Sequence, residues 1–106
     1  MSHETYRSCI DACTACAEEC EHCGDHCMGA AEMGDCARAC RDCADLCWMC
    51  SAFMSRSGLA IADLCRTCAR LCEMCTNECT KHRIEHCRRC AEACRRCAEE
   101  CRKVAA

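Results

Sequence analysis

The sequence lacks proline and has only four glycines, so residues that interrupt helices are scarce. Alanine and charged residues dominate the remainder, a composition that favours helices. No run of apolar residues approaches the roughly 20 that a membrane-spanning helix needs. The sequence therefore predicts an all-α protein that does not cross a membrane.

Two further absences narrow the function. The formal net charge is -3 with both signs scattered along the chain, so no basic patch is available for nucleic acid or a membrane surface. The start of the chain has neither a basic region nor an apolar stretch, which predicts a cytoplasmic protein without an export signal. A length of 106 residues fits a single domain, residues 1–106.

Cysteine is present in large excess. The chain contains 21 cysteines among 106 residues, whereas roughly 8–10% already marks a disulfide scaffold. Secreted disulfide frameworks and intracellular metal-binding proteins both reach high densities. The odd number of cysteines and the missing export signal favour metal binding.

The cysteines fall into four groups, within which the gaps alternate between three and four residues. This spacing places each group on one face of an amphipathic helix. Turn signals separate the groups: Gly29 with Gly34, Ser57 with Gly58, and residues 80–83. We predict an antiparallel up-down-up-down four-helix bundle with a cysteine-lined core and helices near residues 5–28, 32–56, 59–81 and 84–103. The groups are Cys9, Cys13, Cys16, Cys20, Cys23, Cys27; Cys36, Cys40, Cys43, Cys47, Cys50; Cys65, Cys68, Cys72, Cys75, Cys79; and Cys87, Cys90, Cys94, Cys97, Cys101.

Thiols at these positions do not make an ordinary core. A free cysteine behaves as a small hydrophobe, but a full set of cysteines is too small to reach the packing density of a protein interior. Thiols alone should leave a cavity along the bundle axis, at a cost of some kilocalories for each missing large side chain. We therefore expect metal ions to fill the axis.

Nine pairs of cysteines lie four residues apart on one helix. Their Cβ atoms should be about 5–6 Å apart, whereas a disulfide needs roughly 3.5–4.5 Å. A linear sulfur–metal–sulfur unit with bonds near 2.3 Å spans about 4.6 Å and suits the wider gap. The pairs are Cys9/Cys13, Cys16/Cys20, Cys23/Cys27, Cys36/Cys40, Cys43/Cys47, Cys68/Cys72, Cys75/Cys79, Cys90/Cys94 and Cys97/Cys101.

Softness and charge select the metal. Thiolates favour Cu(I), zinc and iron–sulfur clusters. Zinc with four thiolates leaves two negative charges, and only Arg83 brings a basic side chain to the stripes, at one end. One Cu(I) per bridging thiolate is neutral, which predicts roughly 20 Cu(I) ions per chain. The alternative is a zinc or mixed-metal thiolate buffer with the role of a metallothionein; iron–sulfur clusters are disfavoured because no cysteine run followed by proline is present.

The two ends of the predicted bundle differ. Apolar residues should plug one end: Tyr6, Phe53, Met54, Leu59, Ile61 and Val104. The other end, called here the mouth, carries Ala30, Met33, His82 and Arg83, with His26, Met28 and His86 just off the stripes. Imidazole and thioether groups suit copper, so we predict that Met33, His82 and His86 are metal ligands where copper enters. His3 and His22 are predicted to be surface residues.

A second apolar stripe lies beside the cysteines of the two middle helices. Exposed apolar patches often mark subunit contacts, so we predict a homo-oligomer formed through residues 32–56 and 59–81. The stripe comprises Ala39, Leu46, Phe53, Leu64 and Leu71, with Trp48, Met49 and Met74 adding apolar surface.

Four cysteine-lined helices of Cys-x-x-x-Cys repeats resemble the bacterial copper storage proteins over nearly the whole chain. Residues 75–82 and 86–94 are especially similar to the cytosolic branch of that family. The resemblance implies a tetramer of bundles in a bacterial cytosol, Cu(I) held mainly by the thiolate pairs, and uptake at a histidine-bearing mouth. Cys50, Cys65 and Cys87 would then bind copper between helices, and a copper chaperone or small thiol would deliver or remove the ions.

An enzyme is the second alternative. Thiol–disulfide exchange usually needs one Cys-x-x-Cys motif beside a βαβ pattern, whereas this chain has eight such motifs. None is followed by the histidine of c-type haem attachment. Glu19 and His22 lack the carboxylates on other helices that a di-iron site requires. We therefore expect no catalytic activity.

Overall fold

Four α-helices form over the four cysteine groups. The computed structural model describes residues 3–106. In it α1 spans Arg7–Cys27, α2 Gly34–Ser55, α3 Ile61–Cys79 and α4 Glu85–Ala105, and the short 3-10 helices η1 (His3–Tyr6) and η2 (Ala31–Met33) precede α1 and α2. Every predicted helix boundary lies within two residues of the observed one.

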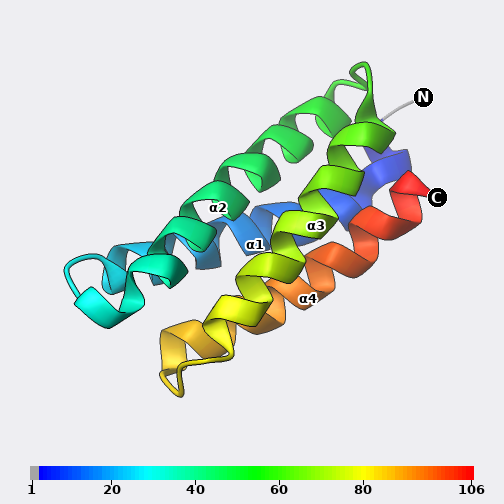
Figure 1. The fold of residues 1–106 in the computed structure, drawn as a ribbon. Coiled ribbons are helices and arrows are strands. Elements are labelled where there is room, and N and C mark those ends of the chain that lie inside the picture. The colour runs from blue at the N-terminus through cyan, green and yellow to red at the C-terminus, as the bar shows by residue number, and fades with distance from the viewer. Residues whose placement is uncertain (1–2) are drawn as a thin grey trace.

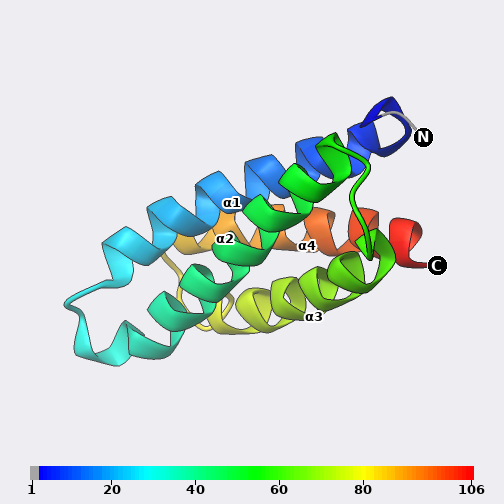
Figure 2. The same cartoon turned by 90° about the horizontal axis from the view of Figure 1, so that it is seen from above.

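The helices form an antiparallel bundle. Each helix packs against the next in sequence, and α4 packs back against α1. The chain reverses at every connection, so η1 and the end of α4 lie at the same end of the bundle in both views (Figure 1 and Figure 2). The molecule measures 44 × 19 × 18 Å. The predicted up-down-up-down architecture is confirmed.

The connections use left-handed backbone conformations to end the helices. Gly29 has a φ of 87° in the turn after α1, a conformation that glycine adopts without strain. After α2, Gly58 donates its N–H to the Phe53 carbonyl at 2.8 Å, and Ser57 donates to Met54 at 3.3 Å, the pattern of a Schellman motif. Gly34, predicted as part of a turn, is instead the first residue of α2 and has a helical φ of -59°.

The interior between the helices is built from small side chains. Cysteines and alanines such as Ala17, Ala44 and Ala91 supply most of the buried surface, while the ion pairs lie on the outside of the bundle. The polar outer faces and small inner faces follow directly from the heptad spacing. None of the described helices is both long enough and apolar enough to span a bilayer.

Candidate metal centre

The bundle axis is lined by thiols. All 21 cysteines are buried, and the most accessible, Cys9, is only 2% exposed. They all lie within residues 3–106 and all are free thiols. The prediction that every cysteine group faces the core is confirmed.

The sulfur atoms form a continuous network across the helices. Within α1, the Sγ atoms of Cys16 and Cys20 lie 3.9 Å apart. Across helices, Cys16 lies 3.6 Å from Cys94, and Cys20 lies 3.6 Å from Cys90. Neighbours on other helices are thus at least as close as the partner on the same helix. In the metal-free structure, the Sγ–Sγ distances therefore do not distinguish the nine same-helix pairs from pairs of cysteines on different helices.

The expected cavity along the axis was a wrong prediction. The Sγ atoms of Cys47 and Cys68 lie 3.6 Å apart, as do those of Cys13 and Cys97, so sulfurs from facing helices are already in van der Waals contact. The distance between packed helices depends on the side chains at the contact. Small side chains on both faces let the helices approach until the thiols touch.

Sets of four metal-ligand atoms recur along this axis. In each set the ligand atoms all lie within 4.8 Å of one another. Cys16 and Cys20 each belong to more than one set, so a sulfur has several neighbours with which it can share a metal ion. Sets that contain only thiols include Cys13, Cys68, Cys97 and Cys101; Cys16, Cys43, Cys47 and Cys72; Cys16, Cys20, Cys43 and Cys94; and Cys20, Cys75, Cys90 and Cys94.

Burial favours the neutral form of three thiols at the mouth end of the axis, Cys27, Cys36 and Cys87. Burial is the main cause that raises the pKa of Cys27 and of Cys36, where the neighbouring Cys79 adds to the shift. Burial likewise raises the pKa of Cys87 to about 12. These thiols therefore carry their protons at neutral pH in the absence of metal. Replacing each proton by a soft monovalent cation keeps the interior neutral, and Arg83 is exposed, away from the axis.

One end of the axis is closed by apolar side chains. Met54 is fully buried and Ile61 is 9% exposed, while Tyr6, Phe53 and Val104 are partly buried and pack against the core to which both belong. The predicted plug is confirmed for these five residues. Leu59 was wrongly included: it is 86% exposed because it lies in the turn before α3.

At the mouth, one of the predicted non-cysteine ligands, His86, lies directly beside the thiols. The Nδ1 atom of His86 lies 3.3 Å from the Sγ atom of Cys23 and 3.6 Å from that of Cys87. These three residues and Cys27 form a further set of four ligand atoms within 4.8 Å. His86 stands in the first turn of α4, which places its ring over the last cysteines of α1.

The other two predicted ligands occupy different surroundings. Met33 is 5% exposed and belongs to the buried core at η2. His82 is half-buried, donates its backbone N–H to the Cys79 carbonyl at 3.2 Å, and lies with Arg88 along a groove between α3 and α4. Both lie at the mouth end of the bundle, but neither shares the set that His86 forms with the three thiols.

Two histidines near the mouth were not predicted as site residues. The ring centroids of His26 and His86 lie 5.1 Å apart, and those of His22 and His26 lie 4.3 Å apart. His22 is exposed, as predicted, yet it is part of a cluster of three imidazoles. The spacing of four residues between His22 and His26 was the available signal, because it puts both rings on one side of α1.

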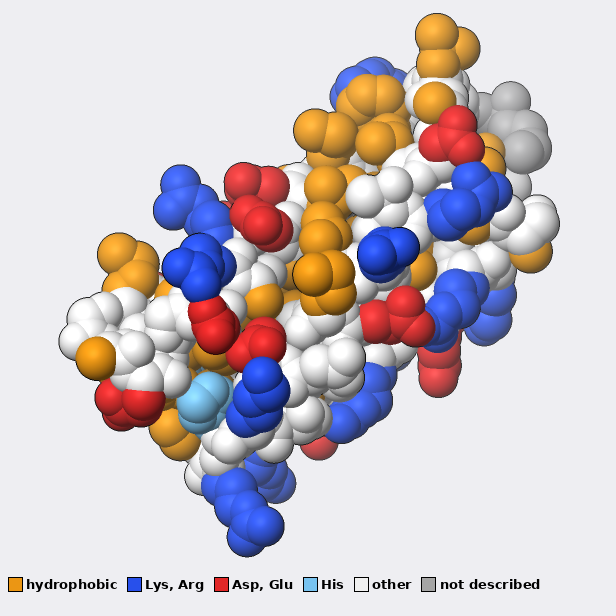
Figure 3. All heavy atoms as spheres, in the orientation of Figure 1, with side chains coloured by type: hydrophobic (Ala, Val, Ile, Leu, Met, Phe, Trp, Pro, Cys, Tyr) orange, Lys and Arg blue, Asp and Glu red, His pale blue; other side chains and the backbone are white. Residues whose placement is uncertain are grey.

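Apolar side chains remain on the outer face of α2 and α3. Trp48 is 39% exposed, Met49 45% and Met74 52%, and Leu46 and Leu64 are partly buried beside them. Figure 3 shows hydrophobic side chains gathered in a row on this face of the bundle. The apolar stripe predicted for the two middle helices is therefore present on the surface.

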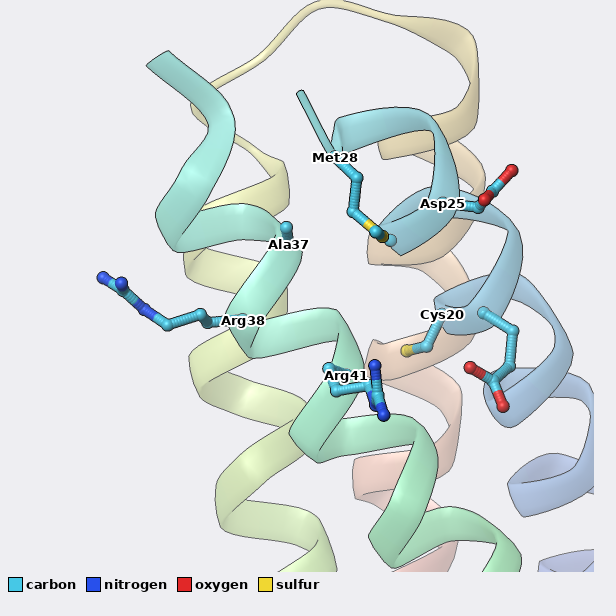
Figure 4. Close-up of a pocket in the computed structure, with 8 residues that line it drawn as sticks. Cys20, Asp25, Met28, Ala37, Arg38 and Arg41 are labelled. Carbon is cyan, nitrogen blue, oxygen red and sulfur yellow. The ribbon is translucent and has the colours of Figure 1, made fainter. Parts of the chain in front are cut away.

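A groove between α1 and α2 lies close to the thiols without opening onto them. It has a volume of about 500 Å³ and is lined by residues that include Cys20, Gly24, Met28 and Arg41. Figure 4 shows Met28 and Arg41 beside the groove. Because Cys20 is fully buried, the groove gives solvent no path to the metal centre.

Comparisons with known proteins agree with this geometry. The sequence profile of a family described as copper storage protein matches residues 2–106. The metal-free Csp3 copper storage protein of Bacillus subtilis has a TM-score of 0.89 at 40% identity, covering 94% of this chain and 98% of that chain. Cu(I)-bound copper storage protein BsCsp3 gives 0.89 at 39% identity, covering 94% and 97%.

A cytosolic copper storage protein from Streptomyces lividans, solved with five coppers, gives a TM-score of 0.91 at 36% identity and covers 97% of this chain and 93% of that chain. No match is found among curated protein sequences. The zinc alternative finds no support in these comparisons. The chain belongs to the copper storage protein family, and its thiol-lined core stores Cu(I).

Proposed function

We propose that this protein takes up Cu(I) at the mouth and stores roughly 20 ions, about one for each thiolate, since that ratio keeps the buried core neutral. The shared membership of Cys16 and Cys20 in several ligand sets carries this proposal. A sulfur that lies close to sulfurs of several other helices can bind two copper ions at once. Such a sulfur bridges the two ions. Bridging lets each Cu(I) have at least two sulfur ligands while the ratio of copper to sulfur stays near one.

All 21 cysteines act as ligands in this proposal. At the mouth, His86 joins Cys23, Cys27 and Cys87 as the first site that an incoming ion meets, supported by the 3.3 Å approach of its Nδ1 atom to Cys23. Met33 and His82 assist from η2 and from the segment after α3. The buried side chains of Met54 and Ile61 close the opposite end to copper.

The remaining expectations complete the proposal. Residues 1–106 act as one storage domain in a bacterial cytosol, as the description of the Streptomyces lividans relative as cytosolic supports. The apolar row on α2 and α3 joins copies into a homo-oligomer, a tetramer as the resemblance to the family implied. A copper chaperone or a small thiol exchanges Cu(I) with the mouth, and the protein catalyses no reaction.

Anaerobic Cu(I) titration followed by native mass spectrometry tests the capacity. We expect saturation near 20 ions per chain, because the charge argument requires about one cation per thiolate. Saturation at about five ions would contradict the proposal, since that ratio fits isolated four-thiolate sites. The same spectra report the number of chains in the assembly.

Stopped-flow uptake of Cu(I) tests the mouth. His86→Ala should slow uptake while leaving the final capacity almost unchanged, and Met33→Ala with His82→Ala should add to the effect. Val104→Ala at the closed end is the matched control and should leave the uptake rate unaltered. Equal rates in all variants would remove the mouth as the route, without affecting the measured capacity.

A further inference from the structure

Arginines gather in a groove at the mouth end of the bundle, between the end of α3 and the start of α4. Its lining includes Arg83, Arg88 and Arg95, with one carboxylate, that of Glu92, and with His82 beside them. We call it the arginine groove. The chain turns from α3 into α4 here in Figure 1, and Figure 3 shows basic side chains at this end of the molecule. The groove is thus positively charged, although the whole chain has a formal net charge of -3.

Two of these arginines have no acidic partner. Arg88 pairs with Glu85, with 3.2 Å between its Nη1 atom and the carboxylate Oε1 atom. Arg83 and Arg95 are exposed, and neither takes part in an ion pair or a side-chain hydrogen bond with any residue from 3 to 106. The N–H donors of their guanidinium groups are therefore open to a ligand from solvent.

The chemistry and the size of the groove define its occupant. Guanidinium groups bind carboxylates and phosphates through paired hydrogen bonds. The groove has a volume of about 220 Å³, whereas one turn of an α-helix, about 10 Å across and 5.4 Å long, already fills roughly 420 Å³. A small anion fits this space, and a helix of a partner protein does not.

The arginine groove adjoins the route that we propose for copper. His82 lines the groove and, in the proposed uptake, assists at the mouth. Cys79 also lines it, and the Sγ atoms of Cys79 and Cys36 lie 3.6 Å apart. Because Cys79 is fully buried, the wall of the groove passes no ion, and His82 is the ligand that a molecule in the groove reaches. A small anion held here is therefore placed where Cu(I) enters.

We propose that the arginine groove binds a small thiol with carboxylate groups that carries Cu(I), and that Arg83 and Arg95 hold its carboxylates. Thiols are the soft ligands that Cu(I) favours. This inference rests on the proposed uptake at the mouth and names the kind of carrier that supplies it. Transfer is an exchange of ligands without oxidation or reduction. The copper–sulfur bond of the carrier breaks, a cysteine at the mouth forms the new one, and the proton that this cysteine loses passes to the sulfur of the carrier.

Transfer of Cu(I) from two dithiols tests the groove. Dimercaptosuccinate has two carboxylates and dithiothreitol has none, so only the first can bind both arginines. Metal-free protein is mixed anaerobically with each Cu(I) complex, and the copper bound after timed separation from the carrier is counted by mass spectrometry. Arg83→Gln/Arg95→Gln should slow transfer from dimercaptosuccinate by about two- to thirtyfold, as the loss of two exposed ion pairs predicts. Transfer from dithiothreitol should keep its rate.

Arg70→Gln/Arg96→Gln is the matched control, because it removes the same charge from residues outside the groove. At an ionic strength of about 0.15 M the Debye length is about 8 Å, so distant charges are screened and both rates should stay unchanged in the control. Added succinate should compete with dimercaptosuccinate for the arginines and slow its transfer.

Four results would overturn the inference: no slowing in Arg83→Gln/Arg95→Gln, equal slowing with both carriers, the same slowing in the control variant, or competition by inorganic phosphate but not by succinate. With any of them, the final copper capacity in the same spectra still tests storage separately. A protein that accepts copper from neither dithiol would overturn the proposed function and this inference with it.

Discussion

The Sγ atoms of Cys20 and Cys90 lie 3.6 Å apart although the two residues belong to different helices. Cys20 is also within 3.8 Å of Cys94 and 4.0 Å of Cys75. A single thiol thus contacts sulfurs from both α3 and α4. The metal-free bundle is held at distances shorter than a linear sulfur–copper–sulfur unit would need.

Copper loading should therefore widen the bundle. Two metal–sulfur bonds in line span about 4.6 Å, so sulfur pairs such as Cys20 and Cys90 that become bridged by two-coordinate Cu(I) should separate by up to about 1 Å. Crystal structures of the same protein with and without Cu(I) would measure this. Helices that keep their spacing on loading would mean that the ions are held with strongly bent sulfur–copper–sulfur angles instead.

Proton release should accompany copper binding. Burial keeps thiols such as Cys87 protonated at neutral pH, and each must lose its proton to become a ligand. Loading with a Cu(I)–acetonitrile complex, whose own ligand is neutral, should release about one proton per ion. A pH indicator in weakly buffered anaerobic solution gives the count. Far fewer protons than copper ions would show that the thiols are ionised beforehand.

The metal-free protein should lose stability in alkaline solution. Burial raises the pKa of the Cys87 thiol from its ordinary 9.0 to about 12 in the folded protein. Above pH 9.0 its thiol ionises in the unfolded chain first, so the unfolded state binds fewer protons and the free energy of unfolding falls as pH rises. Cys27 and Cys36 shift in the same direction. Below pH 9.0 this contribution is fully present.

Urea unfolding under reducing, anaerobic conditions measures that dependence. The Cu(I)-loaded protein is the control, because thiolates bound to copper have no proton to lose and should give a flat profile over the same range. A metal-free protein as stable above pH 9.0 as at neutral pH would contradict the raised pKa of these thiols.

Removing one central thiol should reduce capacity without unfolding the protein. Cys43 contacts Cys72 at 3.6 Å and Cys94 at 4.0 Å. Cys43→Ala should bind about one copper ion fewer, by the charge balance of the core, and should destabilise the metal-free protein by about 1 kcal/mol. Ser51→Ala on the same helix is the control, with full copper capacity expected. An unchanged capacity in Cys43→Ala would show that this sulfur is only a packing residue.

The turn before α3 holds strain that a substitution should relieve. Ala60 has a φ of 58°, a left-handed conformation that costs a residue with a side chain roughly 1–2 kcal/mol. Ala60→Gly should raise the free energy of unfolding by about 0.5–1 kcal/mol, after the greater freedom of glycine in the unfolded chain is counted. Ala62→Gly, inside α3, should instead lower it by a similar amount, about 0.5–1 kcal/mol. Urea unfolding compares the two variants, and a loss of stability in both would contradict the strain.

The sequence was sufficient to predict the helices because every turn of each helix carries a cysteine. That repeated marker gave the helix boundaries to within two residues and the identity of the buried face. It was not sufficient to predict the distance between helices. The packing argument for the thiols assumed a fixed helix spacing, whereas small side chains let the helices approach until thiols such as Cys47 and Cys68 touch.

The mouth was predicted only in part for a related reason. His86 and Cys23 are far apart in sequence, and their 3.3 Å contact depends on how α4 is rotated and shifted along α1. The cysteine spacing fixes the face of each helix but not that shift. Met33 illustrates the same limit: the spacing placed it on the extended stripe, but its burial in η2 follows from the path of a connection.

The plug formed by Met54 and Ile61 makes the thiol array a blind channel. If copper ions pass only through the opposite end, the ions that bind first and deepest are the last to be released. Copper beside Cys9 and Cys101, next to the plug, would be the last to leave, while copper beside Cys23 and Cys87 would exchange first. Such a protein would hold a rapidly available fraction and a deep reserve within one chain, although thiolates bind most of the copper in both.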